Sequence, residues 1–394
     1  MKSQPSKSKY HFSTLLVHAG EEPDSQTGSI APVLVRSKTF SQNIFGEEGE
    51  YQYSRGKNPT RVKLEEKLAI LEGGGQASVF GSGVAAEAAL FLTLSPGDQL
   101  FCCQEIYGGT YRLLSELLNR FGIVSRFVNF NNEKEICAAV TPQTKYLWVE
   151  TPTNPSLHVI DFSLVARVSK QLSIPFVVDS TFAPPCSTRP FEYGAETVIH
   201  SLSKYIAGHN DVLGGAVITK NPGLHERLVF MQKTLGAVLS PDECYRVLQG
   251  VKTLTLRWRW VSESALCVSR FLVTHRKVKR VLYPGLISHP GHVIAKRQSR
   301  EGFGGVLSFE LREHRLEKLK CFVDVLRKTS PIIYGESLAS PETIISYPAL
   351  MSHKSLPQEV RRSLGISDSF FRLSLGFEDP KDIIFGFTSA LNAI

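Results

Sequence analysis

Short apolar segments alternate with segments of helix length between residues 60 and 220. The expected strands are Ala77–Phe80, Gln99–Cys103, Tyr146–Glu150, Phe176–Asp179, Thr197–His200 and Gly215–Thr219. The expected helices are Thr60–Glu72, Gly83–Leu94, Gly109–Phe121 and Phe162–Leu172. Because strands joined by helical crossovers pair in parallel and are covered on both faces, we expect an α/β fold with a mostly parallel sheet flanked by helices.

The pattern changes beyond about residue 250. A long helix is expected over Thr253–Thr274, then a strand at Gly305–Leu311, a helix at Leu316–Lys328 and a strand at Phe371–Leu375. A chain of 394 residues also exceeds the usual size of one hydrophobic core. We therefore predict an N-terminal arm over residues 1–58, an α/β domain over 59–250 and a smaller α+β domain over 251–394.

Composition and charge exclude several classes of protein. Hydrophobic residues make up 42% of the chain and charged residues 21%, which is typical of a globular protein rather than a disordered one. The apolar run Ala85–Leu94 is broken by Glu87 and is shorter than the roughly 18 residues of a membrane span, so no membrane partner is expected. The net charge of +8 is spread over the chain without a nucleic-acid-binding module, so no nucleic-acid partner is expected either.

The cysteines indicate a reducing compartment. The seven cysteines are scattered and form no CxxC pair, which predicts free thiols rather than a disulfide framework or a zinc site. Residues 1–10 are polar and lack the apolar centre of a secretory signal. We therefore expect a cytoplasmic protein with no bound metal.

Three polar clusters stand at the ends of expected strands, where doubly wound sheets bind ligands. Gly81–Val84 opens an apolar helix, whose free N–H groups and dipole can hold a phosphate, although a simple cap or turn would look the same. Asp179 ends a strand and is either a cap or a ligand. Lys204, between the hydroxyls of Ser201 and Ser203, would become a nucleophile for an aldehyde if buried, and an ordinary lysine if exposed.

Together the three clusters describe one ligand. Lys204 suits an aldehyde, Asp179 suits a pyridinium nitrogen, and the helix start with its serines suits a phosphate, which is the chemistry of pyridoxal 5′-phosphate. Two alternatives are an aldolase that uses Lys204 without a cofactor, and a binding protein that has lost catalysis. The aldolase would have no need for the acid and the phosphate site together.

The sequence resembles the cystathionine γ-synthase and γ-lyase family, pyridoxal-phosphate enzymes of Cys and Met metabolism. The similar segments run in order over about residues 12 to 390: Tyr53–Arg55 with Asn58–Arg61, Gly81–Gly83, Tyr107–Thr110, Glu150–Pro155, Val178–Phe182, Ser203–Tyr205 with Gly208–His209, Gly302–Gly305 and Arg372–Gly376. This resemblance implies the fold type I transferase architecture, related to aspartate aminotransferase, with a seven-stranded type of sheet and a smaller C-terminal α+β domain.

The resemblance also implies roles for individual residues. Catalysis would fall to Lys204, Tyr107 and Asp179, and the cofactor would further contact Asn154 at its phenolic oxygen. The phosphate would be held by Ser82, Gly83, Val84, Ser201 and Ser203, and by Tyr53 and Arg55 of the neighbouring subunit's arm. The family pattern therefore implies a homotetramer, a dimer of dimers with shared active sites. The substrate, a small amino acid, would be bound by Arg372, Glu336 and Ser337.

The substrate side departs from the family pattern at several positions. Gln52 stands where relatives that bind a distal ammonium often carry an acid, and Gly109 stands where methionine γ-lyases carry a cysteine. Trp258 and Trp260 are unusual, and the helical spacing of the run Arg257–Trp260 predicts that one Trp packs inward and one Arg is solvated. Glu336 resembles an acidic position of the γ-synthases and γ-lyases, and a carboxylate there can pair with a second ammonium, which favours elimination or replacement at the γ-carbon. An exposed glutamate at a strand end would look the same. Cystathionine β-lyase and O-acyl-homoserine sulfhydrylase remain the alternatives.

Overall fold

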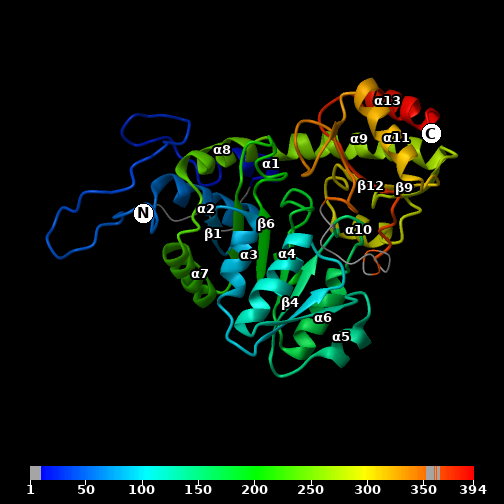
Figure 1. Cartoon of the computed structure of the whole chain (residues 1–394). Coiled ribbons are helices and arrows are strands. Elements are labelled where there is room, and N and C mark those ends of the chain that lie inside the picture. The colour runs from blue at the N-terminus through cyan, green and yellow to red at the C-terminus, as the bar shows by residue number, and fades with distance from the viewer. Residues whose placement is uncertain (1–9, 352–358, 360, 362–363) are drawn as a thin grey trace.

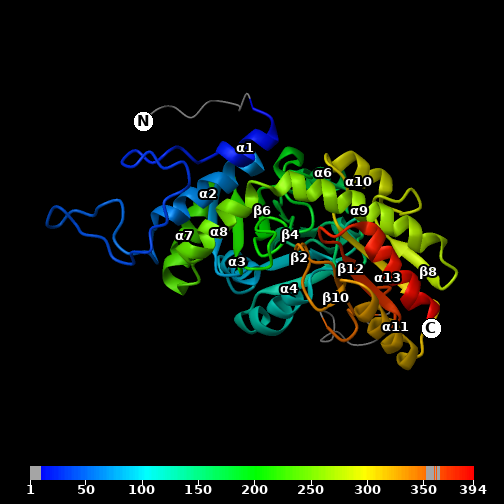
Figure 2. The same cartoon turned by 90° about the horizontal axis from the view of Figure 1, so that it is seen from above.

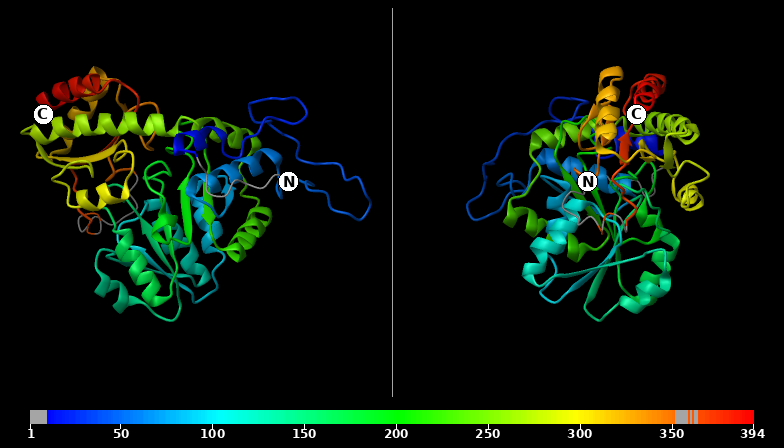
Figure 3. Two further views of the ribbon diagram at one scale, coloured as in Figure 1. Left: turned by 180° about the vertical axis from the view of Figure 1, so that it is seen from behind. Right: turned by 45° about the vertical axis from the view of Figure 1, so that its right-hand side comes forward.

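The computed structural model describes residues 10–351, 359, 361 and 364–394. Within them the chain forms two sheets, each with its own buried cluster of apolar side chains. The large sheet lies in the first part of the chain and the small sheet in the last part, with α9 (Leu254–Thr274) running between them (Figures 1 and 3). The fold is therefore the expected α/β architecture with a smaller second sheet.

The large sheet has seven strands in the order β1-β7-β6-β5-β4-β2-β3. Their bounds are β1 Gln76–Phe80, β2 Gln99–Cys103, β3 Val124–Val128, β4 Thr144–Glu150, β5 Phe176–Asp179, β6 Thr197–Ser201 and β7 Gly215–Thr219. All run parallel except β7, which pairs antiparallel with both β1 and β6. The six predicted strands are all present, and β3 is an additional edge strand.

Helices flank this sheet (Figure 1). They are α2 Pro59–Glu72, α3 Gly83–Phe91, α4 Gly108–Arg112, α5 Glu133–Ala139, α6 Phe162–Leu172, α7 Pro222–Leu235 and α8 Pro241–Val251, with a 3₁₀ turn at Pro190–Tyr193. The start of α2 shows why the sequence folds as it does, because the Asn58 side chain accepts from the amides of Thr60 and Arg61 and Pro59 takes the first helical position. The helix predicted over 109–121 is not continuous, since α4 passes into a π-helical turn at Leu113–Leu117 and a 3₁₀ turn at Leu118–Phe121.

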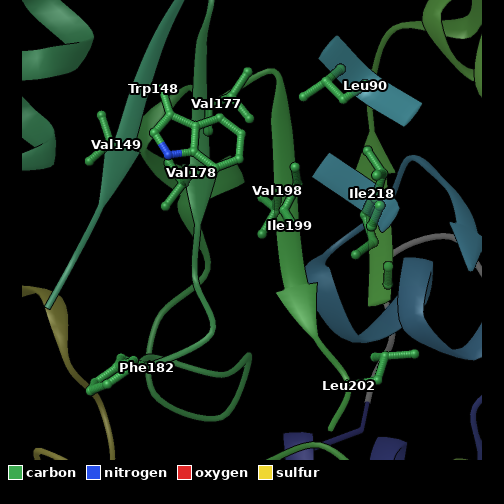
Figure 4. Packing of buried hydrophobic residues seen from close by; sticks show 14 of the residues in the cluster. Leu90, Trp148, Val149, Val177, Val178, Phe182, Val198, Ile199, Leu202 and Ile218 are labelled. Carbon is green, nitrogen blue, oxygen red and sulfur yellow. The ribbon is translucent and has the colours of Figure 1, made fainter. Parts of the chain in front are cut away.

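Side chains on both faces of the central strands form the core of the large sheet. Figure 4 shows Trp148 of β4 beside Val177 and Val178 of β5, with Val198 and Ile199 of β6 next along the sheet. All five of these side chains are almost fully buried. Burial on both faces is typical of parallel strands and explains their near-continuous apolar sequences.

The small sheet has five strands in the order β10-β11-β12-β9-β8, and only β10 and β11 pair in parallel. Its elements are β8 Val278–Leu282, α10 His292–Gln298, β9 Val306–Leu311, α11 Leu316–Thr329, β10 Ile333–Tyr334, β11 Ile344–Ser346, β12 Phe370–Ser374 and α13 Pro380–Asn392. Aromatic rings form its core, where Phe309 contacts Phe322, Phe371 and Phe387. The predicted helix and strands of this region are present within one or two residues.

The N-terminal segment extends away from the rest of the chain. After α1 (Phe12–His18), residues 19–58 contain no helix, and they project outward in both views (Figures 1 and 2). Apolar side chains of this arm face solvent, as the exposed fractions of 85% for Ile30 and 106% for Phe45 show. No helix in the described residues is long and apolar enough to cross a membrane.

Candidate active site

One cavity lies at the carboxyl ends of β4, β5 and β6 and has a volume of about 560 Å³. It is bordered on its other side by residues of the small-sheet region. Twelve predicted site residues line it: Ser82, Gly83, Val84, Tyr107, Asn154, Asp179, Ser201, Ser203, Lys204, Glu336, Ser337 and Arg372. The topology thus brings together segments that lie almost 300 residues apart in the sequence.

The start of α3 forms one wall of the cavity. Ser82 caps this helix, its hydroxyl accepting from the Ala85 amide at 3.0 Å, while the amides of Gly83 and Val84 have no acceptor among the described residues. Gly83 lies against Ser201, since a Cβ at Gly83 would stand 3.0 Å from the Ser201 Cβ. Two free amides at the positive end of a helix dipole, with hydroxyls beside them, fit a phosphate group.

Asp179 is buried at the end of β5, and one of its two carboxylate oxygens is already hydrogen-bonded within the chain. Its Oδ1 accepts from the amide of Thr181 at 3.0 Å and from the Thr181 hydroxyl at 2.6 Å. No described residue donates to Oδ2, which leaves that oxygen for a ligand. Burial raises the pKa of the Asp179 carboxyl, against the lowering by the Thr181 hydrogen bonds. A cationic ring nitrogen at Oδ2 would supply the missing partner and favour the ionised carboxylate.

The side chain of Lys204 is the candidate for the reactive amine of the site. Its Nζ donates to the Ser337 hydroxyl at 2.7 Å, and no carboxylate lies within ion-pair distance in the described part of the chain. Burial, with the nearby positive charge of Arg372, lowers the pKa of the Lys204 amine to about 8. About a tenth of the Lys204 amine is therefore unprotonated at pH 7, far more than for an ordinary lysine, and the unprotonated amine is the form that attacks an aldehyde.

Arg372 is almost fully buried on β12 and has an uncommitted donor. Its Nη1 donates to Asn154 Oδ1 at 2.9 Å and its Nη2 donates to the Ser337 carbonyl at 2.7 Å. Its Nε has no hydrogen-bond partner among the described residues. A buried guanidinium without a carboxylate is suited to bind one from outside, such as the α-carboxylate of an amino acid.

Tyr107 stands at the cavity with 39% of its surface exposed. Its ring lies over Gly109, where an added Cβ would be only 2.3 Å from the Tyr107 Cε1. Glycine is therefore needed at this position for the ring to lie as it does. Burial and the charge of Glu87 raise the pKa of the Tyr107 hydroxyl, which keeps it in the protonated form.

Residues 13–392 match the Cys/Met metabolism PLP-dependent enzyme family. The chain belongs to this family. The match covers nearly the whole chain, and it agrees with the aldehyde, pyridinium and phosphate chemistry of the cavity.

Members of the family with three different activities resemble the chain to similar degrees. Cystathionine beta-lyase of Coxiella burnetii is 42% identical over 97% of this chain and 98% of its own length. Cystathionine gamma-lyase of Bacillus subtilis is 39% identical, covering 97% and 99%. The solved structure of cystathionine gamma synthase from Xanthomonas oryzae pv. oryzae, in complex with cystathionine, superposes with a TM-score of 0.93 at 36% identity and covers 98% of this chain and 99% of that one.

As a member of the Cys/Met metabolism family, the chain is a pyridoxal-phosphate-dependent enzyme. The free helix-start amides, the uncommitted Asp179 Oδ2 and the Lys204 amine provide one partner for each polar end of this cofactor. When bound, pyridoxal phosphate supplies the electron-withdrawing ring that allows bonds at the substrate's α-carbon to break.

Three further charged residues line the cavity that sequence reasoning did not select: Glu87, Arg112 and Glu150. Glu150 accepts from the amides of Tyr107 and Asn154, at 2.7 and 3.1 Å, and so orients two loops of the site. Glu87 is buried beside Thr110, and its carboxyl pKa is raised well above normal by burial and by the charge of Asp179. One sequence feature could have identified Glu87 as a site residue, because it is a charged residue inside an otherwise apolar helix.

Tyr53 and Arg55 do not reach the cavity of their own chain. Arg55 Nη1 instead donates to the Lys233 carbonyl at the end of α7, at 2.5 Å, and Tyr53 is 46% exposed. Both residues lie near the base of the projecting arm. Their predicted contact with the phosphate therefore requires a second chain.

Proposed function

We propose that the enzyme catalyses elimination or replacement at the γ-carbon of a sulfur-containing or homoserine-derived amino acid. The observation that carries this proposal is Glu336, which lines the cavity and has no ion-pair partner among the described residues. Its negative charge acts on Lys204 and Arg372, raising the pKa of both groups against the effect of burial. A carboxylate in this position is available to a cation on the substrate.

The distal end of cystathionine is itself an amino-acid head, with an ammonium and a carboxylate. The cavity offers both complements, because Arg112 also lines it without an ion-pair partner in the described part of the chain. Glu336 and Arg112 both act on the Tyr107 hydroxyl, the first raising and the second lowering its pKa. We assign the distal ammonium to Glu336 and the distal carboxylate to Arg112.

The geometry of the cavity and the family resemblance support specific roles for the residues of the cofactor site. We assign the covalent bond to the cofactor and the proton transfer at the α-carbon to Lys204, and the ring nitrogen to Asp179. Asn154 is assigned to the cofactor's phenolic oxygen, and Tyr107 to the ring face and to protonation of a leaving thiol. The phosphate is assigned to the amides of Gly83 and Val84 with the hydroxyls of Ser82, Ser201 and Ser203.

The proximal end of the substrate is assigned to the small-sheet side of the cavity. Arg372 has its Nε free to donate to the substrate α-carboxylate, and its planar fork gives a geometry that lysine cannot reproduce. Ser337 holds the Lys204 amine through its hydroxyl and the guanidinium through its carbonyl. Substrate binding and the reactive amine are therefore linked through one serine.

We further propose a homotetramer, a dimer of dimers, in which the arm of one chain brings Tyr53 and Arg55 to its neighbour's phosphate site. The exposed apolar side chains of the arm support an assembly that covers them. The seven free cysteines, of which four are buried, fit a reducing compartment such as the cytoplasm.

The test compares Glu336→Val with wild-type enzyme on cystathionine and on a methyl thioether substrate. We expect the variant to lose turnover of cystathionine and to gain turnover of the thioether. A bound methyl thioether would cover the exposed Glu336 carboxylate without giving it a partner, and the variant removes that cost. Glu342→Gln is the matched control, since Glu342 is an exposed acid of the same loop region and does not line the cavity. Equal changes for both substrates would refute the role of Glu336.

A product assay separates the γ-carbon proposal from its alternatives. Wild-type enzyme is offered cystathionine and cysteine alone, and O-succinylhomoserine and O-acetylhomoserine each with either cysteine or sulfide. The formation of cystathionine, cysteine, homocysteine and keto acids is followed. Cysteine released from cystathionine, or cystathionine formed from an acylhomoserine and cysteine, supports the proposal. Homocysteine and pyruvate, without cysteine, from cystathionine would establish the β-lyase alternative. Homocysteine formed from an acylhomoserine and sulfide, with no cystathionine formed from cysteine, would establish the sulfhydrylase, which uses sulfide in place of cysteine at the γ-carbon.

A further inference from the structure

Lys204 is carried by a short helical turn, residues 201–208, that ends abruptly. Within it the Ala207 amide donates to the Leu202 carbonyl at 3.0 Å and the Gly208 amide donates to the Lys204 carbonyl at 2.8 Å. Gly208 then adopts a left-handed backbone with φ of +72°. The next two carbonyls, of Tyr205 and Ile206, accept from no backbone amide among the described residues. Such carbonyls at the end of a turn need another donor when they are buried.

The guanidinium of Arg257 supplies these donors from α9. Its Nη1 donates to the Tyr205 carbonyl at 2.7 Å, and its Nη2 donates to the Ile206 carbonyl at 3.3 Å. The remaining contacts are Nη2 to the Gly250 carbonyl at 2.8 Å and Nε to the Thr253 hydroxyl at 3.0 Å. Every nitrogen of the guanidinium is therefore engaged, and all of its acceptors are neutral.

Burial makes this arrangement unusual for an arginine. Arg257 is only 8% exposed and forms no ion pair within the described residues. An isolated buried cation is unfavourable unless hydrogen bonds compensate it, so its carbonyl partners are needed for the charge to stay buried. The positive charge also lies at the carbonyl end of the Lys204 turn, where a cation is electrostatically favourable.

The surrounding backbone is shaped around this contact. A Cβ at Gly208 would stand 1.9 Å from Arg257 Nη1, and a Cβ at Gly250 would stand 2.1 Å from the Ala207 carbonyl oxygen. Glycine at both positions therefore allows the Lys204 turn to lie directly against the guanidinium and the end of α8.

The next residue of α9 strengthens the same attachment. The buried Trp258 ring packs edge-on against Tyr205, with ring centroids 4.9 Å apart. Tyr205 in turn accepts from the Gly305 amide through its hydroxyl at 3.0 Å. By contrast, Trp260 is 42% exposed and Arg259 pairs with Glu301 at the surface, as the helical spacing predicts.

We propose that Arg257 is a positioning residue for the enzyme's reaction. By fixing the Lys204 turn onto α9, the helix that leads into the small-sheet region, it sets where the Lys204 amine stands in the cavity. Arg372, to which we assign the substrate carboxylate, belongs to that small-sheet region. Arg257 therefore fixes the position of the Lys204 amine relative to the bound substrate. The inference rests on the role proposed above for Lys204.

The experiment compares Arg257→Met and Arg257→Lys with the control Arg259→Met, an exposed arginine of the same helix. In the cofactor-loaded enzyme we expect Arg257→Met to lower kcat by about 100-fold with KM within about threefold, because a misplaced reacting group slows turnover without removing substrate contacts. Arg257→Lys should be intermediate, since an ammonium cannot form the planar fork. Arg259→Met should match wild type.

A second measurement starts from cofactor-free protein. Pyridoxal phosphate is added, the reaction is stopped with borohydride at set times, and mass spectrometry gives the fraction of Lys204 modified. We expect Arg257→Met to slow this modification by about tenfold, and Arg259→Met to leave it unchanged. Both effects on Arg257→Met together support the proposal.

Several outcomes would overturn it. Wild-type kcat and wild-type modification rate in Arg257→Met, with only a lower unfolding temperature, would show that Arg257 merely stabilises the fold. If Arg257→Met does not fold, wild-type values of both quantities in Arg257→Lys would overturn the proposal equally. Unchanged turnover in Lys204→Ala would instead refute the role of Lys204, whatever the Arg257 variants do.

Discussion

The Nζ of Lys204 lies 2.7 Å from the hydroxyl of Ser337, a residue that is 133 positions away and has a left-handed backbone with φ of +83°. The amine comes from the large-sheet side and the hydroxyl from the small-sheet side. With this hydrogen bond in place, no carboxylate of the described residues lies within ion-pair distance of the amine. It also places the amine beside the guanidinium of Arg372, to which Ser337 is bonded through its carbonyl.

Lys204→Ala should abolish turnover while leaving the fold intact. Removing the amine removes both the covalent link to the cofactor and the proton carrier, so we expect a loss of about 1,000-fold or more. Purified wild-type protein should be yellow, and borohydride should remove its visible absorption band and mark Lys204. Wild-type turnover in the variant, or a protein that stays colourless with added pyridoxal phosphate, would contradict this.

The Lys204 amine should react as a group with a pKa of about 8 in the cofactor-free enzyme. Burial disfavours the ammonium, the charge of Arg372 disfavours it further, and Glu336 partly opposes both. The rate of acylation of Lys204, followed by mass spectrometry against the exposed Lys320, should therefore rise through about pH 8. Glu336→Gln should move that midpoint down and Arg372→Gln should move it up. Shifts of the opposite sign would contradict the electrostatic account.

Ala339→Gly should stabilise the fold. Ala339 has φ of +62°, a conformation that glycine adopts freely but that a residue with a Cβ adopts only at an energetic cost. We expect a gain of about 1 kcal/mol in the free energy of unfolding. Ala265→Gly, a buried position inside α9, is the control and should lower that free energy by a similar amount. A loss of stability in Ala339→Gly would show that the strain is absent.

Arg55→Ala should weaken cofactor retention through the neighbouring chain. The prediction is tested by mixing Arg55→Ala with Lys204→Ala subunits under conditions that exchange them. Hybrid dimers then contain one site with both residues intact, so about a quarter of wild-type activity should return. No recovery in verified hybrids, or unchanged retention in Arg55→Ala alone, would mean that Arg55 does not act across the interface.

The site residues at strand ends could be predicted from the sequence, because the sequence shows both where an apolar strand ends and which functional group stands there. Asp179 and Lys204 follow or end apolar strands, and the topology of an α/β sheet brings such ends to one edge. Strand β3 was not predicted because it is an edge strand whose side chains are mostly half-exposed, so its sequence lacks a clear apolar pattern.

Other features depended on contacts that no local pattern encodes. The break of the helix after Arg112 into a π-helical turn is set by packing, since its sequence is compatible with a regular helix. Arg112 itself belongs to the cavity only because that helix lies beside it. Buried Arg257 looked like a solvated residue of a helix, because its acceptors are carbonyls that any sequence would supply.

The reversed strand β7 has a consequence for how the molecule folds. Because β7 runs antiparallel to β6, the two strands are joined by the single loop that carries Lys204, and their ladder pairs Ser201 with Gly215. These contacts are local in sequence, whereas the approach of Gly83 to Ser201 joins residues more than a hundred positions apart. Since closing a long loop costs more chain entropy than closing a short one, the hairpin that bears the amine can form early, and the phosphate site is completed only when the distant N-terminal part of the sheet docks onto it.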